Sequence, residues 1–264
     1  MKPIYIVSWL FALAVSFVSC DDWLDKTPKD RLYPDVYFKT EDELRLFTNQ
    51  FYNNLVPSAV DIYSESSDLI VKSDLMLEMS GQRIIPDEGN GWNFTALRDI
   101  NFYLQYSHNC TEVNARNRYD GVARFFRAYF YFEKVKRYGD IPWYDNSDDP
   151  ELYKARDSRE FVMQKMLEDL DFAIANLPKT KNAYVLTRWT ALALKSRVCL
   201  FEGTFRKYHG LEDCEKYLNA CVSASETFMN ESGYTLYKSG STPYRDLFAS
   251  INLQADEVIF GRDY

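Results

Sequence analysis

The chain has 264 residues, a net charge of −8 at pH 7, and a composition that is 46% apolar and 16% aromatic. The acidic balance argues against nucleic acid as a partner and against attachment to anionic lipid through a basic patch. The length suits one large domain or two small ones and is ample for a buried core.

The start of the chain has the pattern of a bacterial lipoprotein signal. Lys2 precedes an almost unbroken apolar run from Ile4 to Val18, and Ser19-Cys20 follows directly. The run is shorter than the about 20 residues that span a bilayer, and its flanks are those of a secretory signal. We therefore expect residues 1–19 to be removed and Cys20 to carry the lipid that tethers the protein to a membrane.

Two residues before the cysteine depart from the usual lipoprotein box. Phe17 and Val18 occupy its first two places, so only Ser19 fits well. The alternative is an ordinary signal peptide that is cut elsewhere, which would leave Cys20 as a plain thiol. No second apolar stretch in the sequence is long enough to span a membrane.

A polar lead-in over residues 21–35 gives way to a helical pattern. Thr40 and Glu43 have the spacing of a capping box, and apolar residues then recur at intervals of three and four. Pro57 ends this helix. Residues 58–92 contain several glycines and are predicted to form a long, functional loop region.

Two consecutive helices are expected next, over residues 95–114 and 118–138. The second is apolar on nearly every face, so it must be buried between neighbours. Gly139 and Pro142 terminate it, the glycine as the residue directly after the helix. An acidic loop follows over residues 145–150.

Three more helices are expected, over residues 158–177, 187–205 and 211–229. Ser158 and Thr187 stand at the N-cap positions of the first two. Neighbouring helices of this kind predict antiparallel hairpins. In residues 192–203, large and small residues fall where tetratricopeptide repeats place theirs, but the match is degenerate and a regular repeat stays open.

The last part of the chain, residues 233–264, changes character. Tyr234–Tyr237 and Glu257–Phe260 are predicted to be short strands separated by turn residues. The sequence stops directly after the second segment, which indicates a truncated C-terminal lobe. Cys110, Cys199, Cys214 and Cys221 form no dense framework, so we expect them to be buried small apolar residues, with disulfide pairing left open.

Five segments in register resemble the SusD family (RagB/SusD) of nutrient-binding lipoproteins. They are Asp22-Trp-Leu-Asp25 with Pro28, Phe38 to Asn54, Ala123 to Tyr144, Arg159 to Pro178 and Arg188 to Gly203. The strongest is ARFFRAYFYFEKVKRYGDIPWY, which is similar to a family block ending in Y-G-D-V-P. Trp143 departs from that block, where the family has an aliphatic residue. Family members continue well beyond this length, so the resemblance covers their N-terminal part.

The resemblance implies a mainly α fold of tetratricopeptide-like antiparallel helical hairpins with long loops and a few short strands. It divides the chain into a lipoprotein signal peptide (1–19), a helical domain (20–232) and the start of an incomplete C-terminal lobe (233–264). It further implies a lipid-anchored protein on the outer face of an outer membrane. Such a protein binds glycan without catalysis or a cofactor and partners a TonB-dependent transporter of the SusC type.

Glycan capture needs flat aromatic faces for the C–H surface of sugars and planar polar groups for their hydroxyls. The candidate residues lie in and beside a glycine-rich loop: Trp92, Asn93, Asn90, Arg83 and Arg98. Trp92 would be the stacking platform; the structural alternative is a ring packed against the helix that begins at Thr95. Trp143, Tyr144 and Trp189 are expected in the core.

Other functions have weaker signals. His108 and His209 are the only histidines, and neither lies in a metal-ligand pattern. Residues 145–151 could offer oxygen ligands to calcium, but Pro150 stands where an EF-hand loop needs glycine. The rival hypotheses are a helical-repeat interaction scaffold without glycan binding and a glycan hydrolase, whose facing carboxylates a sequence cannot reveal. No catalytic or metal-binding residue is predicted.

Overall fold

The computed structural model describes residues 37–56, 77–82, 84, 91–147, 153–254 and 256–262. By its internal contacts the chain divides into Met1–Tyr37 and Phe38–Tyr264, and every helix described below belongs to the second unit. The predicted lipidation site Cys20 and the candidate glycan-binding residues Arg83 and Asn90 lie outside the described residues.

Helix α3 (Glu41–Leu55) begins at the predicted capping box. The Thr40 hydroxyl accepts the Glu43 N–H at 3.3 Å, and the Glu43 carboxylate accepts the Thr40 N–H at 3.1 Å. Leu44 and Phe51 are buried, which confirms the apolar stripe. The helix ends at Leu55, before the predicted stop at Pro57.

The next two helices meet at a different place from the one predicted. Helix α5 (Thr95–Tyr106) passes into a short 3-10 turn (Ser107–Asn109), and α6 (Val113–Tyr138) begins well before residue 118. Cys110 is fully buried between them, and its N–H donates to the Ser107 carbonyl at 3.1 Å. The connection between the two helices is thus fixed by burial of Cys110 as well as by local hydrogen bonding, and the helical periodicity alone does not show where it lies.

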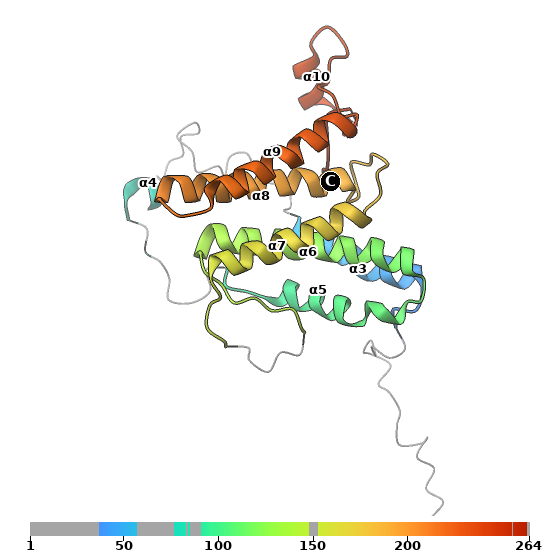
Figure 1. The fold of residues 1–264 in the computed structure, drawn as a ribbon. Coiled ribbons are helices and arrows are strands. Elements are labelled where there is room, and N and C mark those ends of the chain that lie inside the picture. Colours follow the sequence, from blue (N-terminus) through green and yellow to red (C-terminus); the bar gives the residue numbers. More distant parts are fainter. Residues whose placement is uncertain are drawn as a thin grey trace, which may run out of the picture. The chain divides into compact units, whose positions relative to one another are not determined.

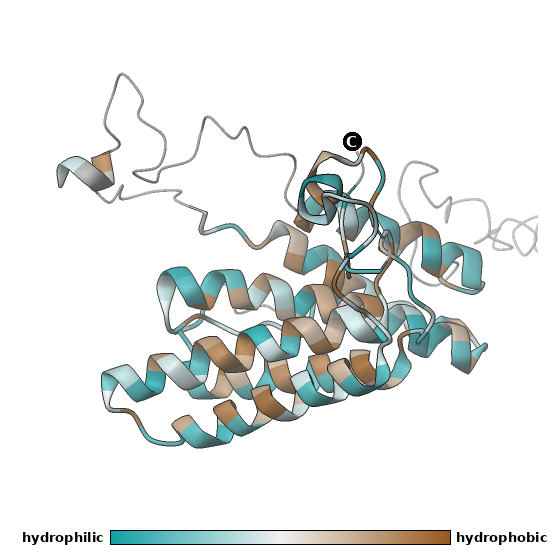
Figure 2. Ribbon diagram, turned by 90° about the horizontal axis from the view of Figure 1, so that it is seen from above, coloured by the Kyte–Doolittle hydropathy of each residue, from teal (hydrophilic) through white to brown (hydrophobic). Residues whose placement is uncertain are grey.

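Helix α6 is the centre of the fold, as its all-round apolar pattern predicts. It packs against α3, α5 and α7 (Figure 1). In Figure 2, hydrophobic and hydrophilic residues alternate along the helices, as expected for helices that are buried on one side. The helix ends at Gly139, whose φ of +72° favours glycine and whose N–H donates to the Val135 carbonyl at 3.0 Å.

Helices α7 (Arg159–Asn176), α8 (Arg188–His209) and α9 (Cys214–Glu231) complete the helical part. The Ser158 and Thr187 hydroxyls cap α7 and α8, as predicted. Helices α6 and α7 pair, α7 also contacts α8, and α8 pairs with α9 (Figure 1). The predicted fold class of helical hairpins is confirmed.

The prediction of two strands near the end of the chain is wrong. Neither 234–237 nor 257–260 forms a strand in the part of the chain that the structure describes. The Thr235 N–H donates to the Asp256 carbonyl at 2.9 Å, but the Tyr237 N–H donates to the Glu257 carboxylate, so no ladder forms. Tyr234 instead stacks on Phe228 of α9, at 5.5 Å between ring centroids.

Two short helices, α4 (Leu77–Ser80) and α10 (Pro243–Ala249), lie outside the hairpins. Across the described ranges, none of the helices has both the length and the apolar character that crossing a membrane requires. Trp143 and Trp189 are buried, as predicted, while Tyr144 is only half-buried and borders a cavity.

Candidate functional site

A cavity of about 310 Å³, here called the Trp92 cavity, lies where the start of α5 meets the segment after α6. This volume is within the range of small-molecule sites. Aromatic, amide, hydroxyl and guanidinium side chains and one leucine border it together. They are Trp92, Phe94, Thr95, Leu97, Arg98, Asn101, Tyr144, Asn146, Ser147 and Tyr153.

The Trp92 ring is held in place while 40% of the residue stays exposed. It meets Phe94 and Tyr138 edge to face, with ring centroids 5.2 and 4.9 Å apart. The Arg156 guanidinium lies over the ring, 5.1 Å from its centroid. Phe94 is the N-cap residue of α5, so the ring packs partly against the start of that helix and partly against the end of α6.

The backbone beside Trp92 is fixed by Gly91. Its φ of +83° favours glycine, and its carbonyl accepts the Lys134 ammonium and the Asn93 N–H, the latter at 2.9 Å. An added Cβ would lie 3.2 Å from the Arg137 side chain and 3.3 Å from the Tyr138 hydroxyl. The close approach of backbone to α6 therefore sets the direction in which Trp92 points.

The structure brings together only some of the predicted candidates. Trp92 and Arg98 both border the Trp92 cavity. Asn93 does not; its amide oxygen accepts the Thr95 N–H at 2.8 Å, so it helps to begin α5 and borders a different cavity. Arg83 and Asn90 fall outside the described residues.

Several residues of the cavity were missed by the sequence analysis because distant segments bring them together. The Asn101 amide donates to the Tyr144 carbonyl at 2.7 Å and accepts Arg127 Nη1 at 3.3 Å. The Gln105 amide oxygen accepts the Ser147 hydroxyl at 2.8 Å in the same way. Polar residues of α5 thus bind the segment after α6, which forms one wall of the cavity. No local sequence pattern predicts these contacts between α5 and that segment.

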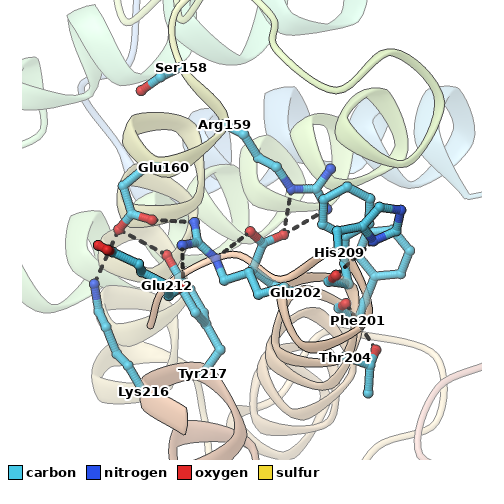
Figure 3. Close-up of polar contacts among 12 residues, drawn as sticks. Ser158, Arg159, Glu160, Phe201, Glu202, Thr204, His209, Glu212, Lys216 and Tyr217 are labelled. Carbon is cyan, nitrogen blue, oxygen red and sulfur yellow. Dashed lines mark hydrogen bonds and ion pairs between the residues drawn. The ribbon is translucent and has the colours of Figure 1, made fainter. Parts of the chain in front are cut away.

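A second group of charged side chains joins α7, α8 and α9 (Figure 3). Glu202 is fully buried and accepts Arg159 Nε at 2.7 Å and Arg206 Nε at 2.8 Å. Arg206 also binds Glu160, which further accepts the Tyr217 hydroxyl at 3.2 Å and Lys216 at 3.3 Å. The two carboxylates are therefore engaged in ion pairs that hold three helices together.

The remaining candidates for chemistry have structural contacts. Nδ1 of His108 and of His209 lies 2.8 Å from a carbonyl of its own helical segment. Within the described ranges no three metal-ligating side chains gather. Cys110 and Cys199 are buried free thiols as predicted, whereas Cys214 and Cys221 are free but only half-buried, because α9 has one face open to solvent.

Curated relatives of this chain are SusD-like proteins. One from Formosa agariphila, P25, is 20% identical over all of this chain and 52% of its own length. Another from that organism, P2, is 27% identical over 74% of this chain and 43% of its own length. The chain thus spans about half the length of the curated relatives it matches.

Solved structures share the helical fold. A SusD-like protein from Bacteroides fragilis has a TM-score of 0.70 at 21% identity, covering 90% of this chain and 48% of that one. A SusD superfamily protein from Bacteroides thetaiotaomicron has a TM-score of 0.63 at 18% identity, covering 84% and 52%. At this level of identity the likeness concerns the fold.

A family pattern described as "starch-binding associating with outer membrane" matches residues 22–200. That range runs from the segment after Cys20 through α3, α5, α6 and α7 and into α8, and it includes the Trp92 cavity. Because the match covers more than half of the sequence, the chain belongs to the SusD-like family.

Proposed function

We propose that this protein is a surface lipoprotein of a bacterial outer membrane that binds a glycan nutrient and passes it to a TonB-dependent transporter of the SusC type. Residues 1–19 would be the signal peptide, Cys20 the lipidated residue, 20–232 the helical domain and 233–264 the start of a second lobe. The family description, which names starch binding and the outer membrane, supports the proposal.

The Trp92 cavity is the observation that carries the proposal. An exposed aromatic ring, the Arg98 guanidinium and the Asn146 amide border the same space of about 310 Å³. Stacking that buries about 100 Å² of sugar contributes about 2–3 kcal/mol. Amide and guanidinium groups then add directional hydrogen bonds to hydroxyls. The combination suits a neutral polyhydroxylated ligand.

The direct test is retention of the protein by polysaccharides in affinity electrophoresis, followed by calorimetry. Starch is named by the family description, and a laminarin-binding SusD-like protein shares the fold at a TM-score of 0.53, so starch and laminarin head the panel. We expect retention by at least one glycan and its loss in Trp92→Ala. A protein that no glycan in the panel retains would contradict glycan binding and favour the interaction-scaffold alternative.

Lipid attachment and the transporter partner have separate tests. Mass spectrometry of the protein from its native membrane is expected to give an N-terminal, acylated Cys20. An intact leader, or a mature N-terminus without fatty acid, would contradict the anchor. Affinity purification of the tagged protein is expected to recover a large outer-membrane transporter, and its absence under mild detergent would contradict that partnership.

A further inference from the structure

A second cavity, of about 590 Å³, lies on the other side of the segment that carries Trp92. We name it the Asp99 cavity; α3, α5 and α6 border it. Successive residues of the segment alternate between the two spaces: Trp92 and Phe94 face the Trp92 cavity, Asn93 faces the Asp99 cavity, and Thr95 borders both. One short stretch of backbone therefore separates two neighbouring cavities.

The Asp99 carboxylate has an unusual environment. It is half-buried in α5 at the wall of the cavity, and no donor within the described residues binds it. Burial raises the pKa of Asp99, although Arg98 next to it acts in the opposite direction. A carboxylate that has lost part of its hydration without gaining protein donors is stabilised when a ligand brings donors to it.

Across the cavity, Lys134 on α6 supplies positive charge and donors. Its ammonium binds the Gly91 carbonyl and lies 4.9 Å from the centroid of the Phe130 ring. Burial lowers the pKa of Lys134, and the nearby charge of Arg137 acts in the same direction. An ammonium has three N–H groups, so the bond to Gly91 leaves donors for a ligand.

The chemistry of the walls selects among ligand classes. The negative charge of Asp99 disfavours an anionic ligand, and the positive charge of Lys134 disfavours a metal cation. The other carboxylate at the cavity, that of Glu133, is already bound to Lys136 at 2.6 Å. Asn54 adds an amide, while Tyr129 and Phe130 add apolar ring surface. Walls that offer a strong acceptor, strong donors and ring surface match vicinal hydroxyls on a sugar, because each hydroxyl both donates and accepts.

We propose that the Asp99 cavity is a second sugar subsite, which binds the continuation of a glycan chain whose neighbouring residues lie in the Trp92 cavity. This inference rests on the proposed glycan binding. The Asp99 carboxylate accepts hydrogen bonds from two adjacent hydroxyls, and Lys134 donates to a third oxygen. The shared border at Thr95 lets one oligosaccharide cross from the first cavity to the second.

The test compares chain lengths in the full chain. Calorimetry is performed with maltoheptaose and laminariheptaose, and with maltose and laminaribiose, on the wild type, on Asp99→Asn and on Trp92→Ala. The matched control is Glu226→Gln, a change of carboxylate to amide at an exposed position of α9. Circular dichroism verifies that each variant is folded.

We expect Asp99→Asn to weaken heptasaccharide binding about tenfold, which corresponds to about 1.4 kcal/mol, and to leave disaccharide binding unchanged. Glu226→Gln should change neither. Equal affinity of Asp99→Asn and wild type for the heptasaccharide, alongside loss in Trp92→Ala, would overturn the second subsite and leave glycan binding intact. If another polysaccharide of the panel is the one retained, its heptasaccharide and disaccharide replace these. Absence of wild-type binding to every glycan of the panel would overturn the proposed function and the subsite together.

Discussion

Arg127 on α6 binds Asp169 on α7 through two parallel hydrogen bonds, from Nε to Oδ2 at 2.6 Å and from Nη2 to Oδ1 at 2.8 Å. Both side chains are almost fully buried, at 10% and 3% exposure. The third nitrogen of Arg127 binds Asn101, which holds the Tyr144 backbone at the wall of the Trp92 cavity. The ion pair therefore connects the α6–α7 hairpin to the candidate site.

Removal of one partner of this pair should be severely destabilising. Arg127→Met leaves the buried Asp169 carboxylate without its bidentate arginine partner. We expect the free energy of unfolding to fall by about 3–5 kcal/mol. Urea denaturation measures the change. In the double variant Arg127→Met with Asp169→Leu much of the loss should be recovered, because no buried charge is left without a partner. Arg124 also loses Asp169, 3.8 Å away, but its side chain is 36% exposed and stays hydrated.

The control is an ion pair between α7 and α8 that is open to solvent only on the carboxylate side, because the Lys195 side chain is 19% exposed. Lys195 binds Asp171, whose side chain is 58% exposed. Lys195→Met should therefore lower the free energy of unfolding by less than about 1 kcal/mol. Equal losses in the two single variants would show that burial does not govern the strength of the Arg127–Asp169 pair.

Substitution by alanine should have opposite effects on stability at two helical glycines, Gly203 and Gly121. A Cβ on Gly203 of α8 would lie 2.7 Å from two carbons of Leu218 and 3.1 Å from its backbone nitrogen, so α9 must move. A Cβ on Gly121 of α6 would meet Leu177 at an ordinary 3.4 Å. Gly203→Ala is expected to lower the free energy of unfolding by about 1–3 kcal/mol, and Gly121→Ala to raise it by up to about 1 kcal/mol. A stabilised Gly203→Ala protein would contradict the close approach of α8 and α9.

Local chemistry explains which parts of the fold were predictable. The caps at Thr40, Ser158 and Thr187 depend on hydrogen bonds within one turn, so the sequence shows them directly. The α5–α6 boundary was misplaced because it depends on burial of Cys110 against other helices. The segments at 234–237 and 257–260 have strand-like composition, but their rings and carboxylate contact α9 and each other without a ladder.

In the candidate site too, residues that lie close together in the sequence were predictable, and contacts between distant segments were not. Trp92 and Arg98 stand in one short stretch with a composition typical of glycan recognition, and both border the cavity. Asn101 reaches Tyr144 only because α5 packs on α6, and these residues are 43 positions apart. Asn93 has the right residue type but a local role, because its side chain caps the backbone at Thr95. Residue type alone could not distinguish a side chain that borders the cavity from one that stabilises the local backbone.

Trp92→Ala should reduce glycan affinity far more than it reduces stability. Loss of a stacking face that contributes about 2–3 kcal/mol corresponds to a Kd about 30- to 150-fold higher for any polysaccharide or oligosaccharide that the wild type binds. The ring is half-exposed, so the melting temperature should change little. Tyr208→Ala removes an 81% exposed ring from α8 and is the matched control, with unchanged affinity. Equal affinity losses in both variants would argue against a stacking role for Trp92.

The cysteines should react with a thiol reagent in two classes. Burial raises the pKa of Cys199 to about 12, and Cys110 is fully buried, so both should react with Ellman's reagent at pH 8 only after unfolding. Cys214 and Cys221 are half-buried on α9 and should react in the native protein. Peptide mapping after differential alkylation distinguishes the classes. A disulfide recovered between any two of these four residues would contradict the free thiols of the structure.

Acid should weaken the network that joins α7, α8 and α9. Burial acts to raise the pKa of Glu160, but hydrogen bonding from Lys216 and the charges of Arg206 and Lys216 outweigh it, so the pKa is lowered. The unfolded chain then binds more protons than the native one at acid pH. The stabilisation from Glu160 is complete above the unfolded value of about 4.3 and is lost as pH falls through the lower native value.

The size of this acid effect follows from exposure. The Glu160 side chain is 43% exposed, so solvent screening limits its contribution to less than about 1 kcal/mol. Urea denaturation at pH 7 and at pH 3.5 should show a smaller acid-induced loss in Glu160→Gln than in wild type. Glu226→Gln, at an exposed position without a partner among the described residues, should follow the wild type. A Glu160→Gln protein with the full acid-induced loss would show that other carboxylates carry the pH dependence.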